Sequence, residues 1–201
     1  MNVPAEARRR SRLGLIGLAA LFFLPLLLAF WLYYGTDWRP AGGAEHGALI
    51  DPPRPLPDVA LLRADGTSTG TGFLRGDWRL VYVGNGACDP GCREALVKSR
   101  QVRLALDKDV NRVARVFLYA GSPPDFGYLT SEHPDLAAAG LDDAAGRSVL
   151  AAFPQDPPPM TAGHLYIVDP LGNLMMRYPA DAAPRAILSD LERLLRLSHI
   201  G

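Results

Sequence analysis

The pattern of apolar residues along the chain predicts two parts, a membrane-spanning helix near the start and an α/β domain after it. Residues 13–34 contain no charged residue and are dominated by leucine, alanine, phenylalanine and glycine. A helix of about 20 apolar residues is long enough to cross the hydrocarbon core of a bilayer. We therefore predict one transmembrane helix over residues 13–34.

The residues that flank this helix predict its orientation. A basic tail, residues 1–12, precedes the helix and contains Arg8, Arg9, Arg10 and Arg12. Large aromatic residues follow at its other end, namely Trp31, Tyr33, Tyr34 and Trp38. Basic residues mark the cytoplasmic side of a span, and aromatic rings favour the headgroup region. The pattern predicts a single-pass protein of the bacterial inner membrane, with a cytoplasmic N-terminus and a periplasmic domain.

A cleaved signal peptide would share the basic start and the apolar run. However, the run is long for a signal peptide. The bulky residues 31–34 (WLYY) also replace the small residues that a cleavage site needs. The sequence favours an uncleaved anchor.

Proline and glycine predict an extended linker over residues 35–57, followed by a folded domain over residues 58–201. Short apolar runs within the domain predict strands over residues 59–63, 67–73, 78–83, 114–120, 164–169 and 174–178. Helical spacing predicts helices from about residue 90 to 106 and from 182 to 197, with one or two short helices in 130–153 broken at Gly140 and Gly146.

The resulting order, β-β-β-α-β-α-β-β-α, contains one βαβ unit in which the strands at 78–83 and 114–120 flank a helix. The strand at 78–83 is mostly apolar, as expected for the centre of a sheet that is covered on both faces. We predict a thioredoxin-like α/β domain with a mixed central sheet and flanking helices. One N-terminal transmembrane helix precedes it.

The distribution of charge argues against nucleic acid as a partner. The whole chain has 21 basic and 21 acidic residues, and from residue 36 onward 17 basic residues face 20 acidic ones. No excess of basic residues is left to follow a phosphate backbone.

The chemistry of the chain centres on Cys88 and Cys92, its only cysteines. They lie where the strand at 78–83 gives way to a helix, with Asp89 as the predicted N-cap and Pro90 at the first helical position. A sulfur in the first turn of a helix is stabilised as a thiolate by the helix dipole, and Arg93 adds a cation. Cys88 is the expected attacking thiol, and Cys92 the resolving thiol or second metal ligand.

Three uses of the pair stay open at this stage: thiol exchange, binding of a Cu(I) ion by two thiolates, and a structural disulfide. A structural disulfide is the weakest of the three, because so short a loop adds little stability. The best candidate for a third copper ligand is His164, which opens the strand after a proline-rich loop. Other possible donors are His46, His133, His199, Met160, Met175 and Met176.

The chain resembles the Sco/SenC family over about residues 58–197. The resemblance is carried by residues 73–84 (FLRGDWRLVYVG), by the Cys88-x-x-x-Cys92 pair and by residues 166–173 (YIVDPLGN). It implies a membrane-anchored, thioredoxin-like copper protein that helps to build the copper centre of cytochrome c oxidase. Cys88 and Cys92 would be its copper-binding, redox-active pair.

The chain departs from the pattern of that family at two points. Asp89, Pro90, Gly91 and Arg93 replace the usual residues between and after the cysteines. The position that corresponds to the histidine ligand of the family is Thr161, and His164 lies three positions later. Either a small loop shift lets His164 serve as the ligand, or the third ligand is lost. Its loss would favour thiol chemistry or an assembly role over stable copper binding.

The leading hypothesis is an assembly factor for cytochrome c oxidase that delivers Cu(I) or keeps the cysteines of the oxidase reduced. Its partner would be an oxidase subunit or another copper or thiol protein, and it would not be an enzyme in the strict sense. A dedicated periplasmic thiol–disulfide oxidoreductase and a non-catalytic scaffold are the alternatives. Peroxide reduction is disfavoured, because no Thr or Ser precedes Cys88 at the spacing that peroxidases use.

Overall fold

The computed structural model describes residues 5–35, 45–63 and 65–198. Trp38, Ala64 and His199, which the sequence predictions include, lie outside this range. The described residues form two separate units, an N-terminal helix and a compact domain that begins at Glu45.

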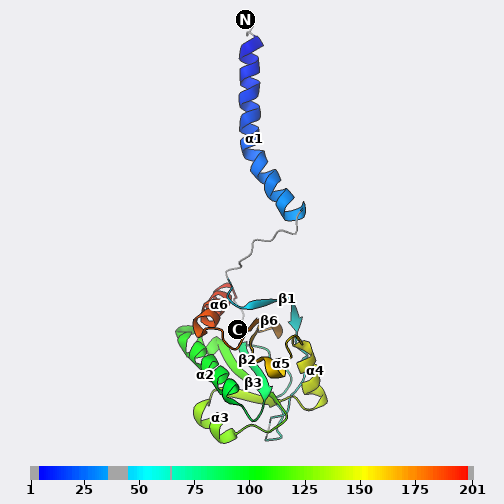
Figure 1. Cartoon of the computed structure of the whole chain (residues 1–201), viewed down its shortest axis with the longest axis vertical. Coiled ribbons are helices and arrows are strands. Elements are labelled where there is room, and N and C mark those ends of the chain that lie inside the picture. The colour runs from blue at the N-terminus through cyan, green and yellow to red at the C-terminus, as the bar shows by residue number, and fades with distance from the viewer. Residues whose placement is uncertain (1–4, 36–44, 64, 199–201) are drawn as a thin grey trace. The chain divides into compact units, whose positions relative to one another are not determined.

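Helix α1 (Ala5–Gly35) contains the predicted membrane span (Figure 1). The segment Gly14–Leu32 is long and apolar enough to cross a membrane, and none of it is buried against other parts of the chain. Pro25 lies inside the helix, and the ribbon of α1 bends along its length (Figure 1). A bend is expected there, because proline lacks the amide hydrogen of the regular ladder and its ring displaces the preceding turn.

The domain is built on a six-stranded mixed sheet with the strand order β1-β6-β5-β2-β3-β4. Its strands are β1 (Ala48–Pro55), β2 (Trp78–Asn85), β3 (Val113–Ala120), β4 (Leu136–Gly140), β5 (Leu165–Val168) and β6 (Asn173–Tyr178). Strands β2, β3 and β4 are parallel, whereas β5 pairs antiparallel with both β2 and β6. The predicted mixed sheet is confirmed, with the strand that leads to the cysteines near its centre.

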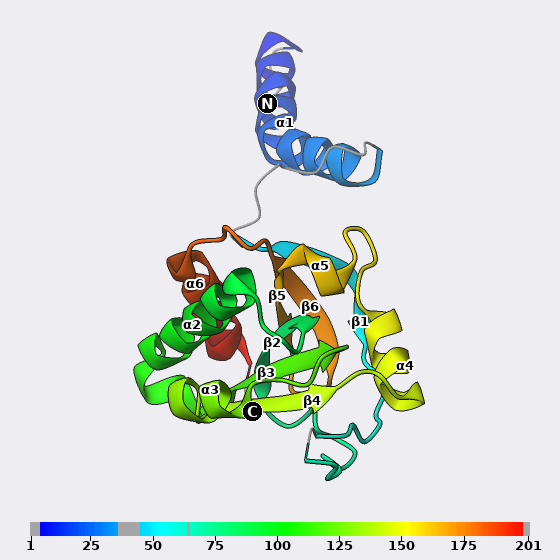
Figure 2. The same ribbon diagram turned by 60° about the horizontal axis from the view of Figure 1, so that its bottom comes forward.

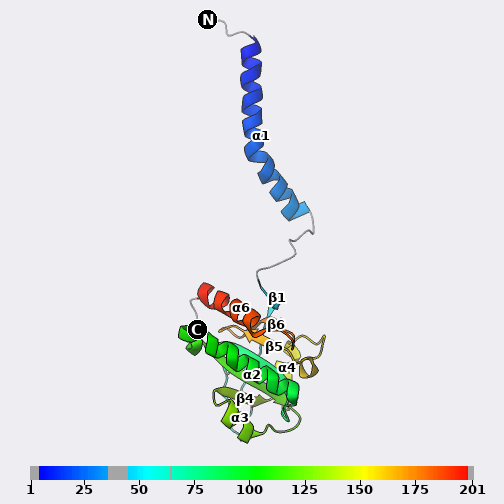
Figure 3. The same ribbon diagram turned by 60° about the vertical axis from the view of Figure 1, so that its left-hand side comes forward.

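The helices cover the two faces of this sheet (Figure 2). They are α2 (Pro90–Ala105), the 3-10 helix η1 (Asp107–Arg112), α3 (Phe126–Glu132), α4 (Ala144–Ala152), α5 (Pro159–Ala162) and α6 (Pro184–Leu197). Helices α2 and α6 lie side by side on one face (Figure 3), and α4 lies on the other. This arrangement confirms the thioredoxin-like prediction.

Alternation along the strands divides the core into two clusters. Leu80 and Tyr82 of β2 belong to the cluster beneath α2 and α6, which we call the cysteine-side core because it contains both cysteines. Val81 and Val83 belong to the opposite core, together with residues of α4. Successive side chains of a strand point to opposite faces, so the parity of a position decides which core it enters.

Part of the predicted linker is folded, which corrects the linker prediction for residues 48–55. These residues form β1, which pairs antiparallel with β6. Proline discouraged a strand prediction, but β1 is an edge strand, where a missing amide hydrogen is tolerated. Ile50 and Leu56 are buried and tie the segment to the opposite core.

Three further predictions were wrong in detail. Residues 59–63 and 67–73 do not form strands, and the described residues of this region contain one isolated bridge, between Leu62 and Ser68. Residues 130–153 contain the predicted short helices, as the end of α3 and α4, but they also contain a strand, β4, because its short run of apolar residues pairs in parallel with β3. Gly146 lies inside α4 and does not break it. Glycine is needed there because a Cβ atom would meet the backbone of Leu141.

Candidate functional site

The two cysteines lie where β2 ends and α2 begins, as the sequence predicts. A short turn joins the two elements. The Cys88 amide donates to the Asn85 carbonyl oxygen at 3.1 Å, and the Ala87 amide donates to the Asn85 side chain at 2.8 Å. The Gly86 amide donates a hydrogen bond to the carbonyl oxygen of Ala120, the last residue of β3, at 3.3 Å. The turn is therefore fixed to the ends of two parallel strands.

Cys88 and Cys92 are joined by a disulfide, with their Cα atoms 5.1 Å apart. Cys88 is 5% exposed and Cys92 is 2% exposed, so both are buried in the cysteine-side core. Cys88 was expected to be open to an attacking partner, and it is only slightly the more exposed of the two. Only a small part of either cysteine is therefore open to a partner in the disulfide form.

Asp89 is the N-cap of α2, and Pro90 occupies the first position, both as predicted. The Asp89 carboxylate accepts a hydrogen bond from the Cys92 amide at 2.8 Å. This amide is consequently not available to a sulfur anion. Burial and the charge of Asp89 also raise the pKa of Tyr82 to about 12, so its hydroxyl is neutral.

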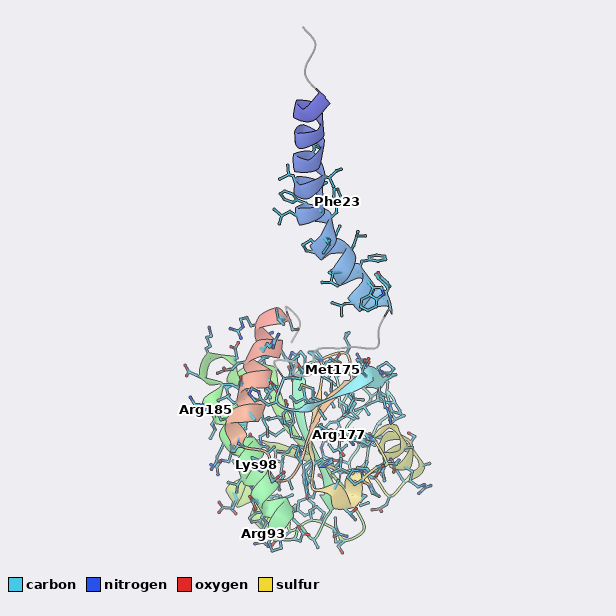
Figure 4. The ribbon with its side chains drawn as sticks, turned by 45° about the horizontal axis from the view of Figure 1, so that its top comes forward. Phe23, Arg93, Lys98, Met175, Arg177 and Arg185 are labelled. Atoms are coloured by element: carbon cyan, nitrogen blue, oxygen red, sulfur yellow. A yellow bond between two sulfur atoms is a disulfide. The ribbon has the colours of Figure 1, made fainter. Side chains whose placement is uncertain are left out.

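Arg93 faces the other cysteine. Its Nε donates to the carbonyl oxygen of Cys88 at 3.3 Å. Its guanidinium lies 4.6 Å from the centre of the Tyr128 ring, which belongs to α3. Figure 4 shows Arg93 at the end of α2 that carries the cysteines. Arg93 therefore bonds to the backbone of Cys88, and Asp89 bonds to the backbone of Cys92.

The structure does not bring His164 together with the cysteine pair. Leu165 points into the cysteine-side core, but the ring of His164 lies 6.0 Å from that of Tyr166, which belongs to the opposite core. His164 Nδ1 is buried without a hydrogen-bond partner. Burial, and then the charge of Arg177, lower the pKa of His164, so its imidazole is neutral at neutral pH.

The other candidate metal donors have structural partners or lie elsewhere. His133 bonds to Tyr128 and Arg115, and His46 bonds to Asp190. Met160 packs against the opposite core, whereas Met176 is buried in the cysteine-side core. Within residues 5–35, 45–63 and 65–198, no three His, Cys, Asp or Glu side chains are grouped so that they could hold a metal ion. Among the described residues, the donors grouped at this site are the two cysteine sulfurs.

Sequence reasoning missed a set of buried polar residues beside the site. Arg115 is fully buried in β3 and donates to Asp135 at 2.9 Å and to the Ser99 hydroxyl at 3.0 Å. Its only signal in the sequence was a charged residue inside an otherwise apolar strand. Tyr128 had no signal, because its contact with Arg93 depends on how α3 packs.

These features define a thioredoxin-like domain with an oxidised CxxxC pair at the start of its first long helix. A family model described as "Transmembrane-like, thioredoxin-like, C-terminal domain" matches residues 78–198. The chain belongs to this family. No protein in a curated collection matches the sequence.

Solved structures of similar fold include several Sco proteins. Apo Sco1 of Thermus thermophilus is 21% identical, with a TM-score of 0.60 over 77% of this chain and 99% of that one. Copper-bound ScoI of Arabidopsis thaliana is 18% identical, with a TM-score of 0.56 over 76% and 99%. BsSco, described as having a disulfide switch and as a member of the Sco family of cytochrome c oxidase assembly proteins, is 13% identical, with a TM-score of 0.56 over 75% and 99%. The likeness to Sco/SenC proteins predicted from the sequence is confirmed, and at these identities it concerns the fold.

Proposed function

We propose that the chain is a membrane-anchored assembly factor for a respiratory cytochrome c oxidase and that it acts by thiol–disulfide exchange through Cys88 and Cys92. The observation that carries the proposal is the disulfide between these residues at the junction of β2 and α2. The fold neighbours supply the setting, because BsSco is described as an oxidase assembly protein with a disulfide switch.

The contact of Arg93 with Cys88, which is also slightly the more exposed cysteine, supports Cys88 as the attacking thiol. In the reduced protein the Cys88 thiolate, beside Arg93, attacks a disulfide of the partner and forms a mixed disulfide, and the released partner thiolate takes up a proton. Cys92 loses its proton and attacks the Cys88 sulfur, which restores the intramolecular disulfide and releases the second partner thiolate. Two electrons pass to the partner, and an external dithiol must reduce the pair before the next cycle.

The anchor places this chemistry at a membrane surface. We propose that residues 1–12 are a cytoplasmic tail, that residues 13–34 span the membrane and that the domain lies on the periplasmic side. Disulfide chemistry fits that side, because the periplasm is oxidising and the cytosol keeps thiols reduced. The folded domain starts at Glu45, so the linker is shorter than the sequence suggested.

Exchange with a partner disulfide is tested with the full chain in detergent micelles. After reduction, the protein should reduce a model peptide disulfide and return to its oxidised form. Cys88→Ser should abolish this reaction, whereas Cys92→Ser should accumulate a mixed disulfide that mass spectrometry detects. The Gln101→Ala variant, at an exposed position further along α2, serves as the control and should keep at least half of the rate. A reduced wild-type protein that leaves the peptide oxidised would remove the proposal.

Copper binding is the second candidate function, favoured by the copper-bound fold neighbour. Two thiolates form a soft site that suits Cu(I). In a competition titration of the reduced chain with a Cu(I) chelator, we expect one Cu(I) ion to bind and Cys88→Ser with Cys92→Ser to abolish its binding. Because the ring of His164 contacts Tyr166 and forms no metal-ligand group with the cysteines among the described residues, His164→Ala should change the affinity less than threefold. A hundredfold loss in His164→Ala would identify it as the third ligand.

A further inference from the structure

Arg93 occupies one of the positions at which the chain departs from the Sco/SenC pattern, and it makes two contacts around the cysteine turn. It is exposed, yet Nε bonds to the carbonyl oxygen of Cys88 while the guanidinium stacks on Tyr128. The planar guanidinium can donate in its plane and stack on an aromatic face at the same time, which an ammonium group cannot do. Arg93 thereby connects the cysteine turn to α3.

The Tyr128 end of this connection is anchored in the core. The Tyr128 hydroxyl lies 3.2 Å from His133 Nε2, and His133 Nδ1 lies 3.4 Å from Arg115 Nη2. A guanidinium only donates, so Nδ1 is the acceptor, and in the neutral imidazole Nε2 carries the proton and donates to the Tyr128 oxygen. Burial, followed by the charge of Arg115, lowers the pKa of His133 and favours that neutral form.

Arg115 is the buried residue at the end of this series of contacts. It is fully buried and bonds to the Asp135 carboxylate, the Ser99 hydroxyl and the Leu96 carbonyl oxygen. Ser99 and Leu96 belong to α2, the helix that begins beside the cysteines. The series of contacts therefore begins on α2 at Arg93 and ends on the same helix at Leu96 and Ser99. We call the residues Arg93, Tyr128, His133 and Arg115 the brace.

The group that this brace holds has a strained backbone. Cys88 has a φ of +47°, in the left-handed region that disfavours residues with a Cβ atom. Such a conformation persists only where the surroundings impose it. When the disulfide is open, the contact of Arg93 with the Cys88 carbonyl is a constraint that can keep this backbone in place and the two sulfur atoms ready to rejoin.

We infer that Arg93 is a positioning residue for the cysteine pair: through the brace it keeps Cys88 in the conformation from which the disulfide closes. This inference rests on the proposed redox function and adds the residue that tunes it. Preorganisation raises the effective concentration of one thiol at the other. The brace accordingly makes the disulfide more stable relative to the dithiol.

The test measures the equilibrium between the dithiol and the disulfide form of the full chain, in detergent, with glutathione redox buffers. Arg93→Gln should lower the equilibrium constant for disulfide formation about tenfold, which is a shift of about 30 mV toward a more oxidising potential. Tyr128→Leu should have a similar effect, and the double variant should add little to either, because both break the same brace. Arg93→Lys should not restore the wild-type value, since lysine keeps the charge without the planar group.

Arg100→Gln is the matched control, because Arg100 also joins α2 to α3, through the Glu132 carbonyl oxygen at 2.9 Å, and it touches neither cysteine. Its potential should equal that of the wild type. An unchanged potential in Arg93→Gln would overturn the inference. If Arg93→Lys keeps the wild-type reduction potential, the effect comes from charge and the brace is not its cause. If Arg100→Gln shifts the potential as much as Arg93→Gln does, the effect comes from any contact between α2 and α3, which would also contradict the inference. The measurement needs no partner protein, so it stands apart from the exchange assay.

Discussion

Gly86→Ala is expected to lower the free energy of unfolding by about 3 kcal/mol. Gly86 lies in the turn before Cys88, and an alanine Cβ there would lie 1.8 Å from the Ser122 carbonyl oxygen. The obstacle is backbone, so it cannot be relieved by rotating a side chain. The turn must move away from the loop after β3, which also displaces Cys88. Chemical denaturation followed by circular dichroism measures the loss.

Gly91→Ala is the control for this prediction, because it makes the same chemical change five residues later. An alanine Cβ at residue 91 meets Asp89 at an ordinary distance of 3.5 Å. Since residue 91 lies within α2, alanine should stabilise the helix by up to about 1 kcal/mol. Equal effects of the two substitutions would contradict the close packing of the cysteine turn against residues 121–124.

Asp190→Ala is expected to cost about 3 kcal/mol of unfolding free energy. The Asp190 carboxylate is 3% exposed and accepts hydrogen bonds from the His46 and Gly47 amides and from the Tyr178 hydroxyl, at 2.8, 3.0 and 2.8 Å. Removal of the carboxylate leaves buried donors without an acceptor. Glu192→Ala, at an exposed position of the same helix, should change the stability by less than about 0.5 kcal/mol.

The acid dependence of stability provides a second measurement on Asp190. Burial acts to raise the pKa of Asp190, but hydrogen bonds from His46, Tyr178 and Gly47 outweigh it and lower the pKa below its ordinary value. A lowered pKa in the folded state adds stability above the unfolded-state pKa, and this stability is lost as the pH falls through the folded-state pKa. The advantage of the wild type over Asp190→Asn should therefore shrink below about pH 4. A difference that stays constant down to pH 2 would show that the carboxylate charge is not what matters.

The elements that the sequence predicts well are those whose local pattern and tertiary role agree. The strand at 78–83 is apolar because it lies in the sheet interior, and Asp89 with Pro90 starts α2 by capping chemistry that involves neighbouring residues alone. The hairpin of β5 and β6 follows from its turn residues. Strand β1 could not be predicted, since whether a proline-containing segment forms a strand depends on the presence of an open sheet edge.

The candidate site divides in the same way. The cysteine pair, its place at a helix start and the adjacent cation are local features, and the structure brings them together as the sequence predicts. The position of His164 relative to the cysteines is not local. Its ring contacts Tyr166, and the spacing between residues in the sequence does not determine how far that ring lies from the turn that carries the cysteines.

The sequence by itself determined the apolar segment of α1, the thioredoxin-like order of the main elements and the location of the two sulfur atoms. Each follows from hydrophobic length, periodicity or capping, which act over a few turns of chain. The tertiary structure alone decided that both cysteines are buried and that Arg93 is connected through Tyr128 and His133 to Arg115. It also decided that Asp190 accepts hydrogen bonds from residues at the start of the domain. These depend on contacts between residues far apart in the chain, whose distances are fixed only when the sheet and helices pack.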